Sequence, residues 1–388
     1  MLTETQRQQV IACCQDLVRA QSLTGREGET AQVVERWLHY LSYDEVWTDT
    51  YGSVIGRIHG QAGPGPRLHF DGHIDHVPAT ALEQWTYPPF SAKLADGKIW
   101  GRAATDMKGP LAAMICAASF LPRDQFRGTV TVSGSVVEEE LEGQVLRSIL
   151  EQHPADFVVI GESTLLQVGI GQKGRAGLRI VTHGRPAHSS VPHLGDNAIY
   201  RMYEVTARLR AMAPPEDELL GSGLMEMVEI ISSPYPGTSI IPDRCTVKWD
   251  RRLVRGETRE SVLAAIRDAL TGIDQVDTSY LEVNVPCYTG AVIQHDDFHP
   301  AWVIPETSPL VQAAIEGVSR VGILPRTCYV PYCTNGSGSA GELGIPSVIV
   351  GPGDPSLFHV VDEWISVDQL VKGTDAYMHM IGILNRPN

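Results

Sequence analysis

The sequence predicts an α/β protein with a mostly parallel, mixed sheet flanked by helices and an inserted two-layer α+β domain. Three observations support this fold class: helical and strand patterns alternate up to about residue 160, the pattern changes near Lys173, and the first pattern returns after about residue 290. Strands that alternate with helices of about ten residues are typical of βαβ units. We therefore expect a main domain formed by residues 1–174 and 291–388 and an inserted domain formed by residues 175–290.

The individual elements follow from the spacing of apolar residues. In the first part we expect helices over residues 5–21, 29–41, 110–120 and 144–152, a hairpin over 45–58, and strands over 67–70, 129–137 and 157–160. The inserted domain should contain strands 176–183, 225–232 and 244–253 and helices 197–212 and 259–270. The last part should add helices over 309–321 and 367–384 and strands over 328–332 and 347–350.

Composition excludes several classes of protein. The 388 residues are 43% hydrophobic and 20% charged, which is an ordinary globular balance. A net charge of -15 disfavours nucleic acid or an anionic membrane as a partner. No apolar run is long enough to span a membrane and no signal peptide precedes the first helix, so we expect a cytoplasmic protein. The seven cysteines form no CxxC pair, which favours buried thiols over disulfides.

Polar clusters follow the predicted strands of the main domain. The candidate metal ligands in these clusters are His73, Asp106, Glu139, Glu162 and His359. Because ligands bind at the carboxyl ends of strands in open α/β sheets, we expect these side chains to converge. Imidazole and carboxylate ligands suit zinc, with manganese or cobalt as alternatives. A carboxylate that bridges two such ions would support hydrolysis.

Two further acidic residues suggest supporting roles. Asp75 is placed to accept the second ring N–H of His73 and so to fix its orientation. Glu138 could take a proton from the attacking water and pass it to the leaving amine. The acidic run extends to Glu140, so the sequence leaves open whether base and ligand are residues 138 and 139 or 139 and 140.

These motifs resemble the co-catalytic zinc peptidase and amidohydrolase family that includes acetylornithine deacetylase, succinyl-diaminopimelate desuccinylase, glutamate carboxypeptidase and aminoacylase. The matching segments are His73-Ile-Asp75, Gly101 to Gly109, Glu138-Glu139, Glu162-Ser-Thr and His359. The resemblance implies one metal ion on His73, Asp106 and Glu162 and a second on Asp106, Glu139 and His359. It also implies that Glu138 is the general acid/base and that a cis peptide often follows the bridging aspartate.

The inserted domain resembles the lid of the same family, which pairs two subunits. His188 lies in an A-H-S-S motif, which implies that it stabilises the oxyanion. Arg252 lies in a D-x-R motif, which implies that it holds a substrate carboxylate. A homodimer or higher homo-oligomer formed through the lid is therefore expected. The chain departs from the family at Ser239, where many members have asparagine, and at Ala103, Ala104 and Pro110, which replace glycines.

The Gly-rich segment 334–341 has two interpretations. Asn335 and Gly336 could bind a substrate carboxylate or carbonyl, or the segment could be a tight packing turn. A serine hydrolase is disfavoured because the segment lacks the G-x-S-x-G pattern, and Cys333 lacks a paired histidine motif. Segments 287–290, 298–302 and 333–341 most resemble the family branch linked to selenium metabolism, which does not define a substrate.

The expected function is hydrolysis of an amide C–N bond in a small molecule, either an N-acyl amino acid or a short peptide, by a two-metal enzyme. The alternative is a non-peptide C–N bond in a carbamate, urea, aryl amide or aromatic amine. Trp85, Trp302 and Tyr332 offer aromatic surface for such a substrate. A non-catalytic binding protein is disfavoured because Glu138 accompanies a complete set of ligands.

Overall fold

The structure, a computed structural model, describes residues 1–386, which divide into two compact units. The larger unit contains residues 1–172, residues 284–293 and the chain from residue 303 onward. The smaller unit contains residues 173–283 and 294–302. The segment 294–302 belongs to the smaller unit because its strand β17 (Phe298–His299) pairs with β9 (Gly174–His183), a non-local pairing that the apolar spacing did not indicate.

A mixed sheet of nine strands forms the centre of the larger unit in the described part of the chain. Its order is β1-β2-β6-β3-β7-β20-β8-β18, and β19 lies beside β8. The bounds are β1 (Glu45–Thr48), β2 (Val54–His59), β3 (Arg67–His73), β6 (Thr129–Ser135), β7 (Phe157–Ile160), β8 (Val168–Gln172), β18 (Trp302–Val303), β19 (Thr327–Val330) and β20 (Ser347–Ile349). Strands β6, β3, β7 and β20 are mutually parallel, whereas β1 and β2 pair antiparallel at one edge. The predicted α/β class with a mixed sheet is confirmed.

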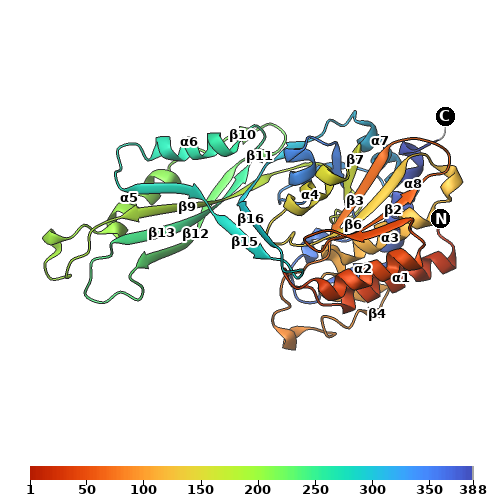
Figure 1. Cartoon of the computed structure of the whole chain (residues 1–388), viewed down its shortest axis with the longest axis horizontal. Helices are drawn as coiled ribbons and strands as arrows, with labels where there is room; N and C mark the ends of the chain where they lie inside the picture. The colour runs from red at the N-terminus through yellow and green to blue at the C-terminus, as the bar shows by residue number, and fades with distance from the viewer. Residues whose placement is uncertain (387–388) are drawn as a thin grey trace. The chain divides into compact units, whose positions relative to one another are not determined.

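Helices flank this sheet, as Figure 1 shows. They are α1 (Glu4–Arg19), α2 (Gly28–Tyr40), α3 (Gly109–Phe120), α4 (Gln144–Gln152), α7 (Pro309–Arg320) and α8 (Val367–Leu384). Helix α1 begins with a capping box between Thr3 and Gln6, which satisfies backbone N–H groups that the helix itself leaves free. Helix α3 is apolar on all sides and is buried over residues 109–118, which fits its contacts with α1 and α8.

The smaller unit is a two-layer α+β structure. Its sheet has the order β12-β13-β9-β14, with β17 also on β9, and the pairings are antiparallel. The other bounds are β12 (Leu224–Ser233), β13 (Arg244–Leu253), β14 (Val276–Tyr280), α5 (Ala198–Arg210) and α6 (Arg259–Ala269). Trp249 is the largest side chain in a core that the sheet and both helices share.

Shorter elements complete the chain. They include a three-stranded sheet of β4 (Lys93–Ala95), β5 (Lys98–Trp100) and β21 (Trp364–Ser366). Two-stranded ribbons are formed by β10 (Glu216–Asp217) with β11 (Gly221–Ser222) and by β15 (Glu282–Pro286) with β16 (Val292–Asp296). The π-helical turns are η2 (Ala104–Lys108) and η5 (Ser337–Glu342). Among residues 1–386, no helix combines the length and apolar character that crossing a membrane requires.

Candidate metal centre

Acidic and histidine side chains of the larger unit gather where the parallel strands end. His73 is the last residue of β3 and is paired in register with Ser135, the last residue of β6. The chain reaches Glu138 soon after β6, and Glu162 soon after β7. Because β3, β6 and β7 are parallel, these residues lie at the same edge of the sheet. The convergence expected from the sequence is therefore observed.

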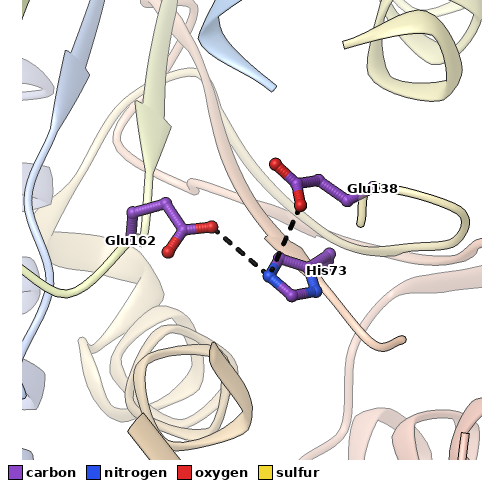
Figure 2. Close-up of side chains that lie close together, drawn as sticks. All are labelled: His73, Glu138 and Glu162. Atoms are coloured by element: carbon purple, nitrogen blue, oxygen red, sulfur yellow. Dashed lines mark ion pairs between the residues drawn. The ribbon is translucent and has the colours of Figure 1, made fainter. Parts of the chain in front are cut away.

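His73 lies at the centre of one group of these side chains. Its Nε2 atom is 3.1 Å from Asp106 Oδ1 and 3.3 Å from Glu162 Oε1. Glu138 Oε2 lies slightly farther from the same nitrogen, at 3.8 Å. Figure 2 shows Glu138 and Glu162 pointing toward the His73 ring from two sides. These four side chains are buried, so their charges meet in a region of low dielectric.

His359 forms a second group around the other oxygen of Asp106. Its Nε2 atom is 3.2 Å from Asp106 Oδ2 and 3.2 Å from Glu139 Oε2. His359 is half exposed, whereas Asp106 and Glu139 are largely covered. One carboxylate thus presents Oδ1 to His73 and Oδ2 to His359.

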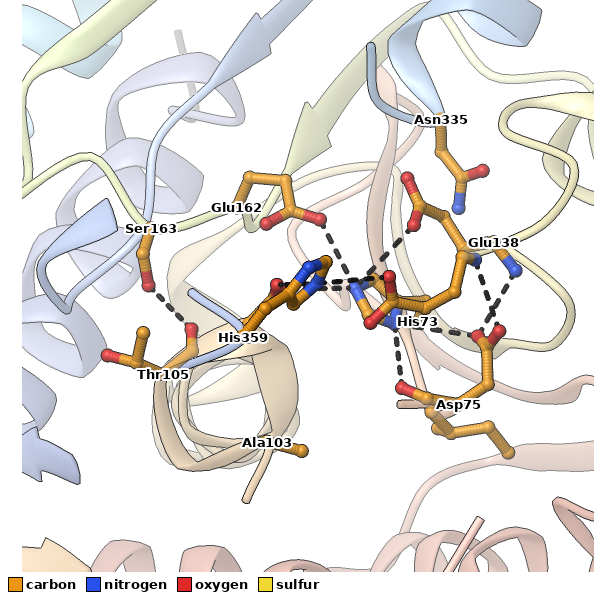
Figure 3. A network of polar contacts seen from close by, with 12 residues as sticks. His73, Asp75, Ala103, Thr105, Glu138, Glu162, Ser163, Asn335 and His359 are labelled. Atoms are coloured by element: carbon orange, nitrogen blue, oxygen red, sulfur yellow. Dashed lines mark hydrogen bonds and ion pairs between the residues drawn. The ribbon is translucent and has the colours of Figure 1, made fainter. Parts of the chain in front are cut away.

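Asp75 connects the first histidine with the turn that carries the two glutamates. Its Oδ1 lies 3.5 Å from His73 Nδ1, and its backbone oxygen lies 3.0 Å from the same atom. Its carboxylate also accepts the backbone N–H groups of Glu138 and Glu139, each at 3.1 Å, as Figure 3 shows. The hydroxyl of Thr24 donates a further hydrogen bond of 2.9 Å. Asp75 therefore restrains both the ring and the turn.

The charges in this cluster shift one another strongly. Burial and the neighbouring Asp106 carboxylate raise the pKa of Glu162 to about 7. Burial, together with nearby glutamates, also raises the pKa of Glu138 well above its usual range. Hydrogen bonds to Asp106 and Glu139 raise the pKa of His359 to about 10. An excess of carboxylates in a buried site is costly unless cations neutralise it.

Two carboxylate oxygens indicate what such a cation would contact. Glu139 Oε1 and Glu162 Oε2 are buried and have no hydrogen-bond partner among the described residues. The groups His73, Glu138 and Glu162, and His73, Asp106 and Glu139, each bring three ligand atoms close enough to share one ion. Imidazole nitrogen with carboxylate oxygen is a donor set suited to zinc and similar divalent ions. The residues therefore fit the bound metal that the sequence indicated.

Comparison with known families agrees with this geometry. Residues 69–382 match the model of peptidase family M20/M25/M40. The chain belongs to this family. The predicted metal-dependent hydrolase acting on C–N bonds is thereby confirmed, as is the resemblance from which it followed.

Similar proteins cover almost the whole M20 chain. The uncharacterized protein YgeY of Escherichia coli strain K12 is 32% identical over 360 residues, which are 90% of this chain and 87% of that protein. A succinyl-diaminopimelate desuccinylase of Magnetococcus marinus is 28% identical over 397 residues, 97% of this chain and 98% of that one. The structure of aminopeptidase PepT from Bacillus cereus superposes with a TM-score of 0.74 at 20% identity, covering 97% and 98% of the two chains.

The turn η2 carries Asp106 in this M20 chain, and the sequence did not reveal how it is held. The Asp106-Met107 peptide is cis, as the resemblance implied. Glu363, which is fully buried, accepts the backbone N–H groups of Thr105 at 2.9 Å and Asp106 at 3.1 Å through Oε1. Its Oε2 accepts Arg102 Nη1 at 2.7 Å. No local pattern marks Glu363, because its partners lie more than 250 positions earlier in the chain.

Asn335 and Gly336, two predicted substrate-binding residues, make contacts within the protein. Asn335 Oδ1 accepts the backbone N–H of Gly143 at 2.7 Å, and its Nδ2 donates to Asp71 Oδ2 at 2.8 Å and Ser135 Oγ at 3.0 Å. Gly336 donates its backbone N–H to the hydroxyl of Thr334. Figure 3 places Asn335 near Glu138. Both Nδ2 hydrogens of Asn335 are used in these contacts, so substrate binding by Asn335 or Gly336 stays a prediction.

His188 and Arg252 belong to the smaller unit. His188 is exposed, and its Nδ1 lies 2.7 Å from Ser190 Oγ. Arg252 lies on β13, where its Nη2 is 3.1 Å from Asp250 Oδ2. Their expected contacts with the oxyanion and with a substrate carboxylate therefore stay predictions.

Proposed function

We propose that this M20 hydrolase uses two divalent metal ions to cleave the amide C–N bond of an N-acyl amino acid or short peptide. The observation that carries the proposal is the orientation of Asp106, whose Oδ1 faces His73 and whose Oδ2 faces His359. Glu162 accompanies the first histidine, and Glu139 accompanies the second. Each side therefore offers one imidazole, one terminal carboxylate and one oxygen of the shared aspartate.

His73, Asp106 and Glu162 would hold one ion, and Asp106, Glu139 and His359 would hold the other. Zinc fits this donor set, and manganese or cobalt are the alternatives. When bound, such ions would lower the pKa of a water molecule and polarise the carbonyl group of the substrate. The unpartnered oxygens of Glu139 and Glu162 support this assignment, because two cations would satisfy them.

Glu138 would move the proton. Its carboxylate is buried beside His73 but is the most distant of the three from Nε2, so it can stay outside the ligand set. A carboxylate with a raised pKa can accept a proton from the attacking water and deliver it to the amine that leaves. The exposure of Glu140 supports the register in which Glu138 is the base and Glu139 the ligand.

The choice of substrate rests on the relatives and on two predicted contacts. The relative named succinyl-diaminopimelate desuccinylase supports an N-acylated substrate. Arg252 would pair with a substrate carboxylate through its guanidinium group, and His188 would donate to the oxyanion. Asn335 holds the turn at Gly143 through its Oδ1, which would help to position the segment that carries Glu138.

One observation keeps a second class of substrate in view. A hollow of about 630 Å³ is lined by apolar residues that include Leu82, Trp85 and Phe90. The guanidinium of Arg102 lies 5.4 Å from the centre of the Trp85 ring, a distance typical of a cation–π contact. Its Nη2 lies 3.4 Å from the backbone oxygen of His359. This link between an apolar hollow and a proposed ligand favours an aryl amide or aryl amine as the alternative.

A panel of substrates tests the proposal. Metal-loaded enzyme should hydrolyse N-succinyl amino acids, N-acetyl amino acids or dipeptides. Dialysis against a metal chelator should abolish this activity. Replacement of the free carboxylate by an amide should raise KM if Arg252 binds it, and Arg252→Gln should remove this preference. Turnover of aryl amides or amines without turnover of any N-acyl amino acid or peptide would contradict the first proposal and support the alternative.

The smaller unit would also form the contact of a homodimer. Helix α5 exposes Tyr200 and Tyr203, which are 76% and 80% accessible, and the edge strand β12 exposes Val228 and Ile230. An exposed apolar surface beside an unpaired strand edge favours association with a second copy. Light scattering should give the mass of a dimer, and Tyr203→Glu should shift it toward the monomer. A cytoplasmic location stays a prediction from the sequence.

A further inference from the structure

One face of strands β2, β6 and β3 carries a stripe of polar side chains. The strand registers place His59 beside Thr129 and Thr129 beside Arg67, in one row across the sheet. The next row contains Arg57, Thr131 and His69. Central strands of α/β sheets are usually apolar on both faces, because helices cover both. The polar rows therefore require partners of their own.

The inner end of the stripe is satisfied by the protein. His69 is 1% exposed, and its Nε2 lies 2.7 Å from the hydroxyl of Ser133. Ser133 in turn donates to Asp71 at 2.5 Å. Asp71 also accepts a hydrogen bond from Asn335 Nδ2. His69, Ser133 and Asp71 are therefore linked by hydrogen bonds within the protein.

The outer end opens into a hollow of about 260 Å³. The residues that line it include Arg57, Arg67, His69, Thr129 and His153. This volume has room for a small tetrahedral ion with a few water molecules. None of the described residues that line it is acidic.

The two arginines are each held by hydrogen bonds to neighbouring side chains. Arg57 donates a hydrogen bond from Nε to Thr131 Oγ1 and pairs through Nη1 with the Glu45 carboxylate. Its guanidinium group lies 5.0 Å from the centre of the Trp47 ring. Arg67 uses Nε and Nη2 for Asp156. Among residues 1–386, Nη2 of Arg57 and Nη1 of Arg67 have no hydrogen-bond partner in the structure. Each guanidinium group is thus held in one orientation and keeps one nitrogen that can donate a hydrogen bond to a ligand.

We propose that this hollow is a binding site for a small oxyanion, held by Arg57 and Arg67 with the Thr129 hydroxyl beside them. Guanidinium groups bind phosphate and carboxylate oxygens through charge-assisted hydrogen bonds, and prior orientation lowers the entropy that binding costs. Glu45 and Asp156 offset part of the positive charge, and His59 also contacts Glu45, so the affinity should be moderate.

The pKa shifts of His69 and His153 agree with this electrostatic environment. Burial, with the positive charge of Arg57 and the nearby His153, lowers the pKa of His69 to about 3. Burial and Arg57 also lower the pKa of His153. The charge of Arg57 thus acts on both histidines, although burial is the larger cause of each shift.

This hollow is separate from the metal cluster. His69 precedes His73 by four positions on the same strand, which corresponds to about 13 Å at the usual rise of a strand. The inference does not rest on the proposed amide hydrolysis.

Isothermal titration calorimetry on the metal-loaded protein tests the site, with sodium phosphate in one series and sodium succinate in another. We expect one of the two anions to bind, and Arg57→Gln and Arg67→Gln to weaken binding by on the order of tenfold. Arg320→Gln, which removes a surface arginine on α7 that pairs with Glu316, should leave binding unchanged. Binding of phosphate alone would identify a phosphate-type ligand, and binding of succinate alone a carboxylate.

Two results would overturn the inference. The first is no binding of either anion. The second is binding that both arginine variants retain in full, which would place the anion elsewhere, for example at the metal ions. Arg67 is half exposed, so Arg67→Gln should fold, and an unchanged circular dichroism melting curve would verify this.

Discussion

The carboxylate of Asp75 accepts the backbone N–H of Glu138 at 3.1 Å. The same carboxylate faces His73 Nδ1, so one buried side chain orients a proposed metal ligand and the turn that presents the proposed base. Carboxylates that support a metal-binding histidine fix its tautomer and ring position. This contact explains why His73 and Asp75 lie two positions apart at the end of a strand.

Asp75→Asn should lower activity while leaving the fold intact. The amide keeps the size of the side chain, but its single oxygen can replace only one of the two carboxylate oxygens that accept the backbone N–H groups of Glu138 and Glu139. We expect kcat/KM to fall roughly 10- to 100-fold, together with metal affinity. Thr24→Val, which removes only the hydroxyl that donates to Asp75, is the matched control and should cost less than tenfold. Wild-type kinetics in Asp75→Asn would contradict this role.

Glu138→Gln and Glu139→Gln should separate proton transfer from metal binding. Glu138→Gln should retain its metal and lose roughly 10²- to 10⁴-fold in kcat, because an amide cannot accept a proton. Glu139→Gln should lose part of its metal, because a carboxylate beside His359 is removed. Metal analysis and steady-state kinetics on both variants measure this. If Glu138→Gln kept full activity and Glu139→Gln lost activity with its metal retained, the base would be Glu139.

His76 should make the stability of the metal-free protein depend on pH. Burial, aided by Lys108, lowers the pKa of His76 to about 4, and its Nε2 accepts the backbone N–H of Ser22 at 3.0 Å. Between pH 6.5 and 4 the unfolded chain binds more protons at this site than the folded chain. The free energy of unfolding should therefore fall as the pH falls through this range, by on the order of 1–3 kcal/mol from this group.

Urea unfolding in the presence of a chelator measures the contribution of His76. The variant His76→Gln cannot titrate in this range, so its stability should fall less steeply between pH 6.5 and 4 than that of the wild type. Parallel stability curves for the two proteins would show that His76 does not contribute.

Glu363→Ala should destabilise the fold and the metal centre together. The substitution leaves Arg102 buried without its carboxylate and frees the backbone N–H groups of Ala103, Thr105 and Asp106. Loss of one partner of a buried ion pair costs about 3–5 kcal/mol, and we expect a loss of stability of that order. Asp362→Asn, which alters the neighbouring and more accessible acid, should cost about 1 kcal/mol or less. If Glu363→Ala were as stable as Asp362→Asn in urea unfolding, the role of Glu363 would be contradicted.

The sequence predicted the elements with strong local patterns. Helix α4 and strand β13 have the predicted bounds, because their amphipathic or alternating patterns are continuous. Strand β8 was missed, since its two glycines weaken the strand pattern and its pairings with β19 and β20 are distant in the chain. Non-local pairing has no signature within a short window of residues.

The candidate site likewise contains residues that the sequence predicts and residues that it does not. His73 and Glu162 could be found because each follows a predicted strand, and the ends of parallel strands meet. Glu363 could not be found in this way, because it acts through the backbone of η2. The sequence marks Asn335 as a candidate binding residue, but its contacts with Gly143 and Asp71 depend on folding that brings distant segments together.

The most direct test of the central claim is the metal content of the wild type, His359→Asn and Asp106→Asn. Each protein would be loaded with excess zinc, gel-filtered and measured by inductively coupled plasma mass spectrometry. We predict two ions per chain in the wild type, about one in His359→Asn, and fewer than one in Asp106→Asn, because among residues 1–386 only Asp106 contacts both histidines. A wild type that holds at most one ion, or an Asp106→Asn variant that keeps two, would contradict the account.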